Sequence, residues 1–364
     1  MREPDLKLDQ KPQVNLSRST AVRMWLVCIC AGIAVIQSAW TDRFSSLEIA
    51  AVAIGAAILA ELLMFYRALV QGKVQNGSAV DNRIADGRIA NGGIADGSAV
   101  ASALVLTLLL PNSIHPVYAG AGVVFAMVVI KHSFGGLGAN WVNPALGGWL
   151  FVRFSWPLVF EQALEGTPLS GSLSLDFPVF QNSSLDAIVS SSLNDKIFSF
   201  MGAELPGGYI DRFFSGPPGI IADRGLCALL LGTIVITASQ ANRAWISAVF
   251  LGVYALLIRV FGALPSGGAI GEGDILFGLC SGGTIAAAFL LAVDPATGAK
   301  SEMGMLAAVI LGAVFSFIFR YSGGEPYGAF FAIALVNALI PLIRSIESRQ
   351  LYSRAGNNRP RKAS

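Results

Sequence analysis

The stretch AVRMWLVCICAGIAVIQSAW, residues 21–40, decides the class of fold. An α-helix rises about 1.5 Å per residue, so a run of about 20 apolar residues is long enough to cross a bilayer. The residues before it are polar and basic, and no small-residue cleavage site follows it. The sequence therefore predicts a retained membrane span rather than a signal peptide.

The rest of the chain continues this apolar character. Of its 364 residues, 54% are hydrophobic and 13% are charged, and the mean hydropathy is +0.62. A soluble domain carries about 25% charged residues. Nine further apolar stretches follow, at residues 48–69, 98–110, 117–131, 144–160, 224–241, 244–263, 274–293, 303–320 and 327–346. We therefore predict an all-α polytopic membrane protein with about ten transmembrane helices. Several stretches are shorter than a straight span requires, which is tolerated only where protein covers the helix ends.

Charge and cysteine usage argue against other classes. The net charge is only +2 and the basic residues gather in tails and short loops, which does not favour nucleic-acid binding. There are two histidines, so a histidine-built metal site is not expected. The four cysteines lie in or beside apolar stretches without metal-ligand spacing, and we interpret them as buried small hydrophobic residues: Cys28, Cys30, Cys227 and Cys280. Redox chemistry would have to come from an organic cofactor.

Lysine and arginine sort the polar segments to two sides of the membrane. The 161–223 loop is rich in acidic residues and falls on one side if the spans alternate. The basic segments fall on the other side, which the positive-inside rule makes the cytoplasm: residues 1–20, 70–97 and 347–364, with Lys131, Arg243 and Lys300. We therefore predict a bacterial inner-membrane protein with two cytoplasmic termini. Its first membrane repeat covers residues 21–160, and its second covers residues 224–346.

The 70–97 segment contains a five-residue repeat. Ile84-Ala85-Asp86-Gly87, Ile89-Ala90-Asn91-Gly92 and Ile94-Ala95-Asp96-Gly97 follow one another. Such repeats can wind into a small calcium-binding solenoid, but three turns are few. We interpret the segment as a polar low-complexity insertion on the cytoplasmic side.

An internal repeat bears on the architecture. Residues 98–111 can be laid on residues 282–295 at a constant offset, and both end in proline. One span later, each half has a basic residue, Lys131 or Arg320, followed by a Gly-Gly turn. Five spans per half make the repeat length odd, so the second half enters the membrane from the opposite side. The sequence thus predicts two inverted five-helix repeats, with sites at their interface.

Two small-residue segments are candidate cofactor contacts. The stretch from Gly135-Gly136 to Asn140 and Asn143 combines glycines with amide side chains, which suit the edge of a planar ring. In the second half, Gly282-Gly283-Thr284 offers a similar approach. We expect the two segments to face each other and to line a cofactor space. A re-entrant turn and close helix packing are the alternatives.

The ordered set of these motifs resembles a known family. Gly135-Gly136-Leu137-Gly138, Asn143-Pro144-Ala145, Gly282-Gly283-Thr284 before Asp294-Pro295, and Gly323-Gly324 before Asn337 are similar to the family formed by the D subunit of the Rnf electron-transport complex and the related B subunit of the sodium-pumping NADH:quinone reductase. The resemblance covers most of residues 20–346. It implies a flavoprotein component of a redox-driven, ion-translocating oxidoreductase that passes electrons between other subunits while Na⁺ or H⁺ moves.

The resemblance also implies a flavin attachment site. In the family, a threonine after the fifth span holds FMN through a phosphoester, and Thr167 in Gly166-Thr167-Pro168-Leu169 occupies that place. The surrounding pattern departs from the family, because Glu161 stands where an aspartate is usual and Leu164 where a serine or threonine is usual. Covalent attachment and a second flavin, such as riboflavin, are left open. NADH would be oxidised elsewhere, since no dinucleotide-binding fingerprint is present.

One carboxylate stands at the end of the eighth predicted span. Asp294 is a candidate for the ion path, because carboxylates in a membrane are costly and usually functional. An ordinary place at the cytoplasmic interface is the alternative. Inverted repeats and broken helices would equally suit a flavin-free channel or secondary transporter, which is the rival function.

Overall fold

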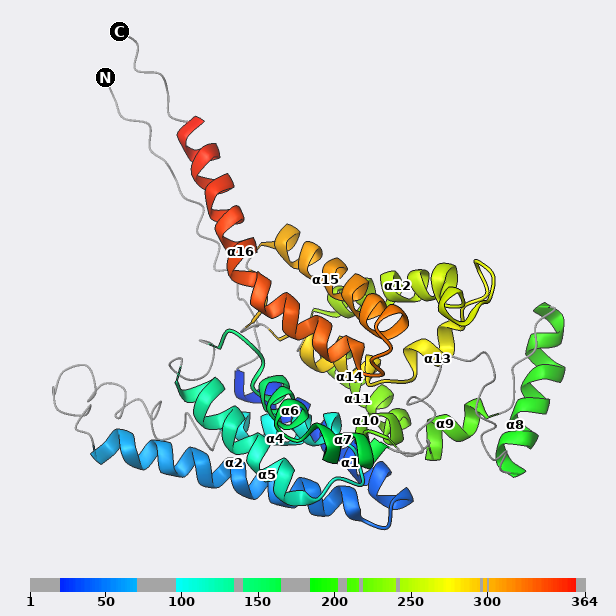
Figure 1. The fold of residues 1–364 in the computed structure, drawn as a ribbon, viewed down its shortest axis with the longest axis horizontal. Coiled ribbons are helices and arrows are strands. Elements are labelled where there is room, and N and C mark those ends of the chain that lie inside the picture. Colours follow the sequence, from blue (N-terminus) through cyan, green and yellow to red (C-terminus); the bar gives the residue numbers. More distant parts are fainter. Residues whose placement is uncertain are drawn as a thin grey trace, which may run out of the picture.

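The computed structural model describes residues 20–70, 96–133, 140–164, 184–201, 208–215, 219–239, 243–294, 297–299 and 301–357. Within these ranges the secondary structure is helical, with one isolated bridge between Pro111 and Ile220. Figure 1 shows most of the long helices stretched along the longest axis of the molecule. The predicted all-α class is confirmed.

Helices cover each of the apolar stretches of the first half. They are α1 (Thr20–Thr41), α2 (Ser45–Val70), α4 (Ser98–Leu109), α5 (Pro116–Phe125) continued by the π-helical η1 (Ala126–His132), α6 (Pro144–Ser155) and α7 (Pro157–Leu164). A short helical segment follows, with α8 (Ser184–Leu193), η2 (Asn194–Phe198), η3 (Ser199–Met201) and α9 (Tyr209–Ser215).

The second half begins at α10 (Ile221–Arg224) and has a similar helix order. It continues with α11 (Leu226–Ala238), α12 (Ala244–Phe261), η4 (Leu264–Ser266), α13 (Ile275–Leu279), α14 (Thr284–Ala286), η5 (Ala287–Leu291), α15 (Glu302–Phe317), the π-helical η6 (Ile318–Ser322) and α16 (Gly328–Asn357). The 274–293 stretch was expected to be one helix, but it is broken between Leu279 and Thr284. The break falls where Gly282 and Gly283 both have a φ of +66°, a conformation that suits glycine and ends a right-handed helix.

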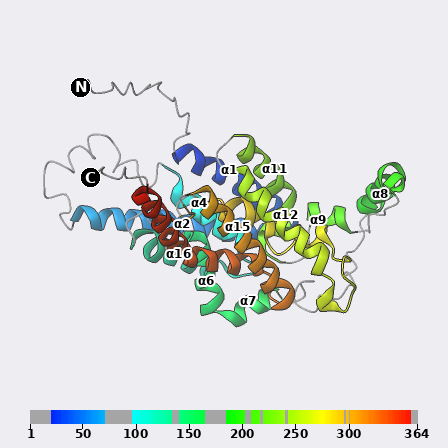
Figure 2. The same cartoon turned by 90° about the horizontal axis from the view of Figure 1, so that it is seen from above.

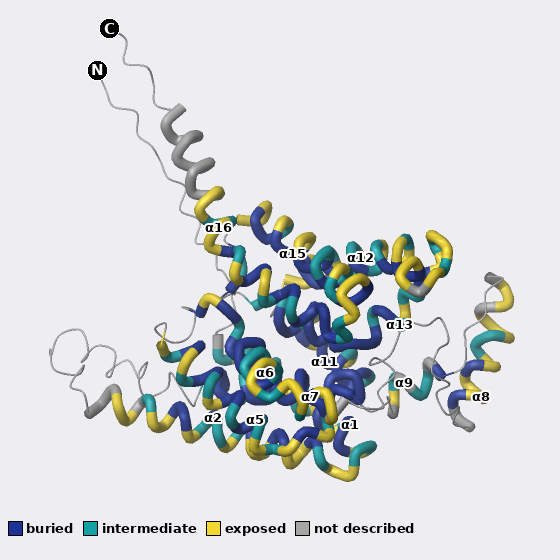
Figure 3. Tube along the Cα trace, in the orientation of Figure 1, coloured by how far each residue is buried: buried dark blue, intermediate teal, exposed yellow. Residues whose placement is uncertain are grey.

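Within the described parts of the chain, five helical segments are long and apolar enough to cross a membrane: Ala21–Thr41, Ser45–Met64, Ala244–Phe261, Glu302–Ser322 and Gly328–Ile346. Three further apolar helices are shorter: Ser98–Leu109, Pro116–His132 and Leu226–Ala238. The outer sides of α2, α12, α15 and α16 alternate between exposed and buried residues along the helix in Figure 3. Large apolar side chains such as Leu59, Leu63 and Leu256 lie on these exposed sides, as expected where lipid is the solvent. The chain is therefore a polytopic membrane protein.

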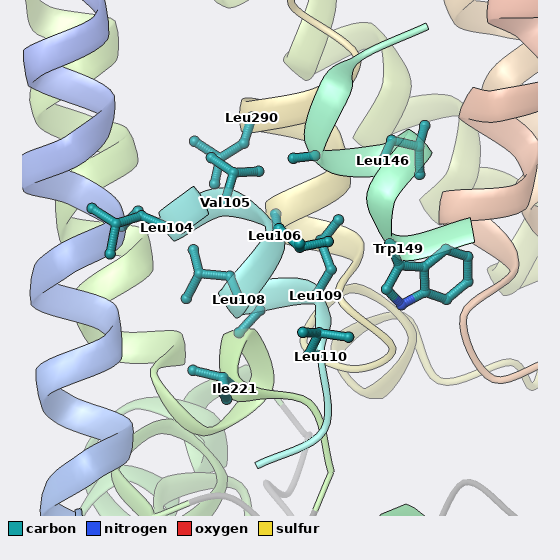
Figure 4. Packing of buried hydrophobic residues seen from close by; sticks show 14 of the residues in the cluster. Leu104, Val105, Leu106, Leu108, Leu109, Leu110, Leu146, Trp149, Ile221 and Leu290 are labelled. Atoms are coloured by element: carbon teal, nitrogen blue, oxygen red, sulfur yellow. The ribbon is translucent and has the colours of Figure 1, made fainter. Parts of the chain in front are cut away.

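The short helix α4 lies at the centre of the larger hydrophobic core. Most of its residues are buried, and it is apolar all round, which is typical of a helix covered on every side. Figure 4 shows Leu104, Leu106, Leu108 and Leu109 of α4 pointing in different directions, toward neighbours that include Leu146 and Trp149 of α6. The sequence predicts this helix as a span, and its length of about 18 Å explains why protein must cover its ends.

Helices α1 and α11 join the two halves by close backbone approach. A Cβ atom added to Gly225, directly before α11, would lie 2.2 Å from the Ala34 carbonyl oxygen. One added to Gly232 would lie 2.2 Å from the Cys30 Sγ atom. Glycine at both positions therefore allows the first helix of each half to pack against the other.

Side-chain contacts define two ends of this helix body. At the first end, the start of α4 lies against the start of α1, because a Cβ atom on Gly97 would lie 3.1 Å from the Trp25 ring. At the second end, Arg224 before α11 donates through Nη2 to Thr41 Oγ1 at 2.8 Å. Helix α11 thus begins where α1 finishes, so the two run in opposite directions.

Candidate functional site

The structure brings Asn143 and Asp294 together. The Asn143 side chain begins α6, since its Oδ1 accepts from the backbone N–H groups of Ala145 at 3.0 Å and Leu146 at 3.4 Å. Its Nδ2 donates to Asp294 Oδ2 at 3.0 Å, across 151 residues of sequence. This pair joins the start of α6 to the segment after η5, and therefore links the two halves at the first end. Asn140 lies nearby in sequence and is buried.

The Gly282-Gly283-Thr284 segment lies at the break between α13 and α14. Asp223 accepts from the backbone N–H of Gly282 at 2.8 Å and of Gly283 at 2.9 Å. Thr284 Oγ1 donates within the turn, 2.8 Å from the Ser281 carbonyl oxygen. The Asp223 contacts pair backbone donors, and the Thr284 contact pairs a backbone acceptor, that the missing helical turn leaves without helical partners.

The chain itself fills the space beside the two glycines. A Cβ atom on Gly283 would lie 2.3 Å from Phe330 Cζ, and one on Gly282 would lie 2.4 Å from the Pro326 carbonyl oxygen. The geometry favours the close-packing alternative at Gly282 and Gly283. Asn143, similarly, uses both ends of its amide on α6 and Asp294.

At the positions that the structure describes, the segment with Asn143 and the Gly282-Gly283-Thr284 segment do not contact each other but bind other residues. Thr284 begins α14, whereas Asp294 follows the end of η5. The run from Thr284 to Leu291 is helical, so Thr284 lies at one end of it and Asn143 contacts the segment that follows the other end. Gly135, Gly136 and Thr167 lie outside the described residues.

A buried arginine on the other side of the break was not predicted. Arg320 of η6 donates through Nη1 to the carbonyl oxygens of Gly278 and Ser281, both at 2.9 Å. Its Nη2 also donates to the Ser281 hydroxyl, and its Nη1 lies 3.4 Å from Thr284 Oγ1. The guanidinium thus covers the carbonyl end of α13, while the Asp223 carboxylate covers the amide end of α14. Each charge has the sign that the helix end attracts.

A second buried cation lies at the first end. Lys131 of η1 donates through Nζ to Glu61 Oε2 at 2.9 Å and to Ser98 Oγ at 2.9 Å. His132 Nε2 lies 3.1 Å from the same Glu61 oxygen. The Lys131 and Glu61 side chains are only 3% and 6% exposed. The sequence assigned Lys131 to a cytoplasmic loop, but it lies inside the protein, where Glu61 compensates its charge and Ser98 accepts a hydrogen bond from it.

The two cations have matching surroundings. Lys131 lies in a π-helical segment and bonds the hydroxyl of Ser98, the first residue of α4. Arg320 lies in a π-helical segment near the hydroxyl of Thr284, the first residue of α14. Lys131 and Arg320 were both visible in the sequence repeat, whereas the matching roles of Ser98 and Thr284 were not, because the repeat lays Ser98 on Gly282.

A third charged group lies at the second end. Glu325, in the loop between η6 and α16, has its Oε2 3.6 Å from Arg153 Nη2 of α6. Burial raises the pKa of the Glu325 carboxyl, and the Arg153 guanidinium opposes this shift. This pair places the end of α6 beside the start of α16.

Apolar spans, a helix broken inside the protein and charges that cover the broken ends define a class of polytopic membrane proteins whose polar sites lie between helices. Comparison with known proteins narrows this class. The NQR2, RnfD, RnfE family model matches residues 7–353, so the chain belongs to that family.

Three relatives illustrate the similarity, and each is the D subunit of a complex. The chain is 26% identical over 340 residues to that of the proton-translocating ferredoxin:NAD(+) oxidoreductase complex of Clostridium ljungdahlii, covering 92% of each chain. It is 26% identical to that of the Na(+)-translocating ferredoxin:NAD(+) oxidoreductase complex of Acetobacterium woodii, over 97% of this chain and 96% of the relative. It is 31% identical to that of the ion-translocating oxidoreductase complex of Alcanivorax borkumensis, over 72% of this chain and 77% of the relative.

Replacing Glu61 by glutamine should destabilise the protein, because Lys131 would keep a buried charge without its carboxylate. Breaking a buried ion pair in this way costs about 3–5 kcal/mol. Thermal unfolding of the purified protein measures the loss. Glu48→Gln is the matched control, since Glu48 lies exposed on the same helix. The double variant Glu61→Leu with Lys131→Met should recover much of the stability. Equal unfolding temperatures for Glu61→Gln and Glu48→Gln would contradict this account of the pair.

Proposed function

We propose that this chain is the D subunit of an Rnf-type, ion-translocating oxidoreductase complex, in which it passes electrons between redox subunits while Na⁺ or H⁺ is translocated. The observation that carries the proposal is full-length similarity: both ferredoxin:NAD(+) oxidoreductase subunits align over more than nine-tenths of each chain. Such coverage goes beyond the likeness that apolar spans alone would produce. The names of these two relatives specify different ions, protons in one and Na⁺ in the other. The similarity therefore supports ion translocation but does not identify the ion.

The partners follow from the same relatives. Each is named as one subunit of a complex, so this chain assembles with other membrane and peripheral subunits. Its activity as part of a translocase therefore belongs to the assembled complex, and the chain is not active alone. Lipid covers its outer helices, and no nucleic acid is involved.

We infer that the spans form two inverted five-helix repeats. The opposite directions of α1 and α11 support this, because they are the first helices of the two halves. The matched pairs of Lys131 with Ser98 and Arg320 with Thr284 support it further, because they would fall at opposite ends of the body. An inverted repeat of this kind places its polar sites between the halves.

We infer that the first end faces the cytoplasm of a bacterial inner membrane. Arg344 of α16 lies there, since its Nη2 donates to the Gly298 carbonyl oxygen beside Asp294. Asp294 stays the candidate for the ion path, at a junction of the two halves on this cytoplasmic side.

Reporter fusions test this orientation. Fusions at Ser364 and near Ser192 should report opposite compartments, because an even number of spans brings both termini to the positive side and leaves the 161–223 loop outside. An alkaline phosphatase fusion should be active only near Ser192, and a fluorescent-protein fusion should be bright only at Ser364. Signals that place both fusions in one compartment would overturn the ten-span arrangement.

We propose FMN as the cofactor, held by Thr167. Helix α7 ends at Leu164, three residues before Thr167, and α6 leads to it from Asn143 at the first end to Arg153 at the second. In the sequence, Thr167 therefore comes directly after α6 and α7 have reached the second end, which we place outside the cytoplasm. A flavin, when bound, exchanges one or two electrons, and the protein supplies position and insulation.

A second flavin, such as riboflavin, stays a proposal for the Gly135, Gly136 and Asn140 segment. Asn143 would position this segment through α6 and Asp294. Gly282, Gly283 and Thr284 would act by holding the helix break, because their neighbours Phe330 and Pro326 already fill the adjoining space.

Thr167→Ala should abolish the flavin fluorescence that stays with the chain on a denaturing gel, because the phosphoester oxygen is removed. Electron flow through the complex should stop with it. Ser170→Ala, three residues further along, removes a hydroxyl from the same loop and should keep the fluorescent band.

Mass spectrometry decides whether the link is covalent. The peptide that contains Thr167 should carry the mass of FMN when the protein is made beside its own flavin transferase. An unmodified peptide would refute the covalent attachment, and FMN released by denaturation from wild type and Thr167→Ala alike would mean binding without a covalent bond.

A further inference from the structure

The helical segment of α8, η2 and η3, residues 184–201, lies apart from the helix body. Figure 1 shows α8 at the right edge, steeply across the horizontal direction of α2 and α12. In Figure 2, turned by 90°, α8 is seen almost end-on while α2 still runs across the view. The two views agree that α8 lies transverse to the membrane-spanning helices.

Two side chains fix the depth of this segment. Asp186 of α8 is buried and accepts from the backbone N–H groups of Gly208 at 2.7 Å and Ile210 at 3.0 Å, which ties α8 to the start of α9. Gln37 of α1 donates through Nε2 to the Phe213 carbonyl oxygen of α9 at 2.9 Å. Gln37 precedes Trp40 by three residues, which is about 4.5 Å along a helix. Helix α9 therefore lies at the level of Trp40, and α8 is tied to α9.

The segment carries an apolar stripe. Val189, Leu193, Ile197 and Phe200 follow one another at intervals of four, four and three residues, so they share one side of the helix. Ile197 is 50% exposed and Phe200 is 94% exposed. Most other exposed positions are small or polar, namely Ala187, Ser191, Ser192, Asp195, Lys196 and Ser199, and Ile188, which is 62% exposed, is the apolar exception outside the stripe. This pattern is amphipathic, and the exposed charges of Asp195 and Lys196 are opposite in sign.

Other exposed aromatic side chains lie at the same end of the protein. Trp40 at the end of α1, Phe44 directly after it and Phe214 of α9 are 84%, 58% and 60% exposed. Aromatic residues gather where the bilayer meets water, because their rings suit the headgroup level. The segment that carries the apolar stripe is tied to α9, and α9 lies at the depth where these exposed aromatic side chains gather.

We propose that residues 184–201 form an interfacial helix that lies in the membrane surface at the second end, with Val189, Leu193, Ile197 and Phe200 inserted among the lipids. The exposed serines and charges face water. Because the exposed charges cancel, insertion depends on apolar contact rather than on attraction to anionic lipid. The helix would thereby hold α8 and the α9 helix tied to it against the bilayer. This inference stands independently of the flavin.

Site-directed spin labelling of the whole complex in liposomes tests the proposal. A nitroxide is attached at Phe200→Cys and, as matched control, at Ser191→Cys on the polar side. Cys227 is replaced by alanine, since the other native cysteines are buried. The ratio of collisions with oxygen to collisions with a water-soluble nickel chelate should be several-fold higher at position 200 than at position 191. The ratio at position 200 should stay higher in liposomes of phosphatidylcholine that contain no anionic lipid.

Three results would overturn it. Equal ratios at both positions, with free access for the nickel chelate, would place the stripe in water. A label at position 200 that is immobilised and shielded from both reagents would mean that another protein of the complex covers the stripe. A ratio at position 200 that falls to the value at position 191 in purely zwitterionic liposomes would show that anionic lipid, not apolar insertion, holds the helix. Electron transfer by the labelled complex, measured in parallel, shows that each variant is assembled.

Discussion

The fold depends on one constraint: backbone polar groups at helix ends inside an apolar body must find partners within the protein. An amide or carbonyl left without a partner there costs several kcal/mol. The break between α13 and α14 exposes such groups, and Asp223 and Arg320 pair them. At the start of α4, the Ser98 backbone N–H donates to Asp96 Oδ1 at 2.8 Å. Charged side chains therefore pair the ends of short helices in this membrane protein.

These polar contacts also assemble the molecule. Asp223 comes from the segment before α11 and reaches the loop before α14, while Asn143 and Asp294 join the two halves across 151 residues. Arg153 and Glu325 do the same at the opposite end. The polar groups thus gather at two ends of the body, separated by the apolar core around α4.

Hydropathy was sufficient to predict the helical class and the positions of the long helices, because an uninterrupted run of about 20 apolar residues is typical of a membrane-spanning helix. It could not predict the break at residues 280–283, since Gly282 and Gly283 look like ordinary packing glycines in a membrane helix. Averaging over a window also hides single charges, so Glu61 disappeared within α2, whereas Arg320 was recognised in the repeat but not as a buried residue. Asn143 and Asp294 were recognised singly, but only the folded chain shows that they are partners. Thr167 rests on family resemblance alone.

We propose that the chain is an electron carrier rather than a passive channel, although the two functions could share the same helices. The absorption spectrum of the purified protein separates them most directly, before and after reduction with dithionite. An electron carrier should show the visible bands of a flavin, and these should bleach on reduction and return with an oxidant. A colourless preparation that conducts solute by itself in liposomes would contradict the assignment.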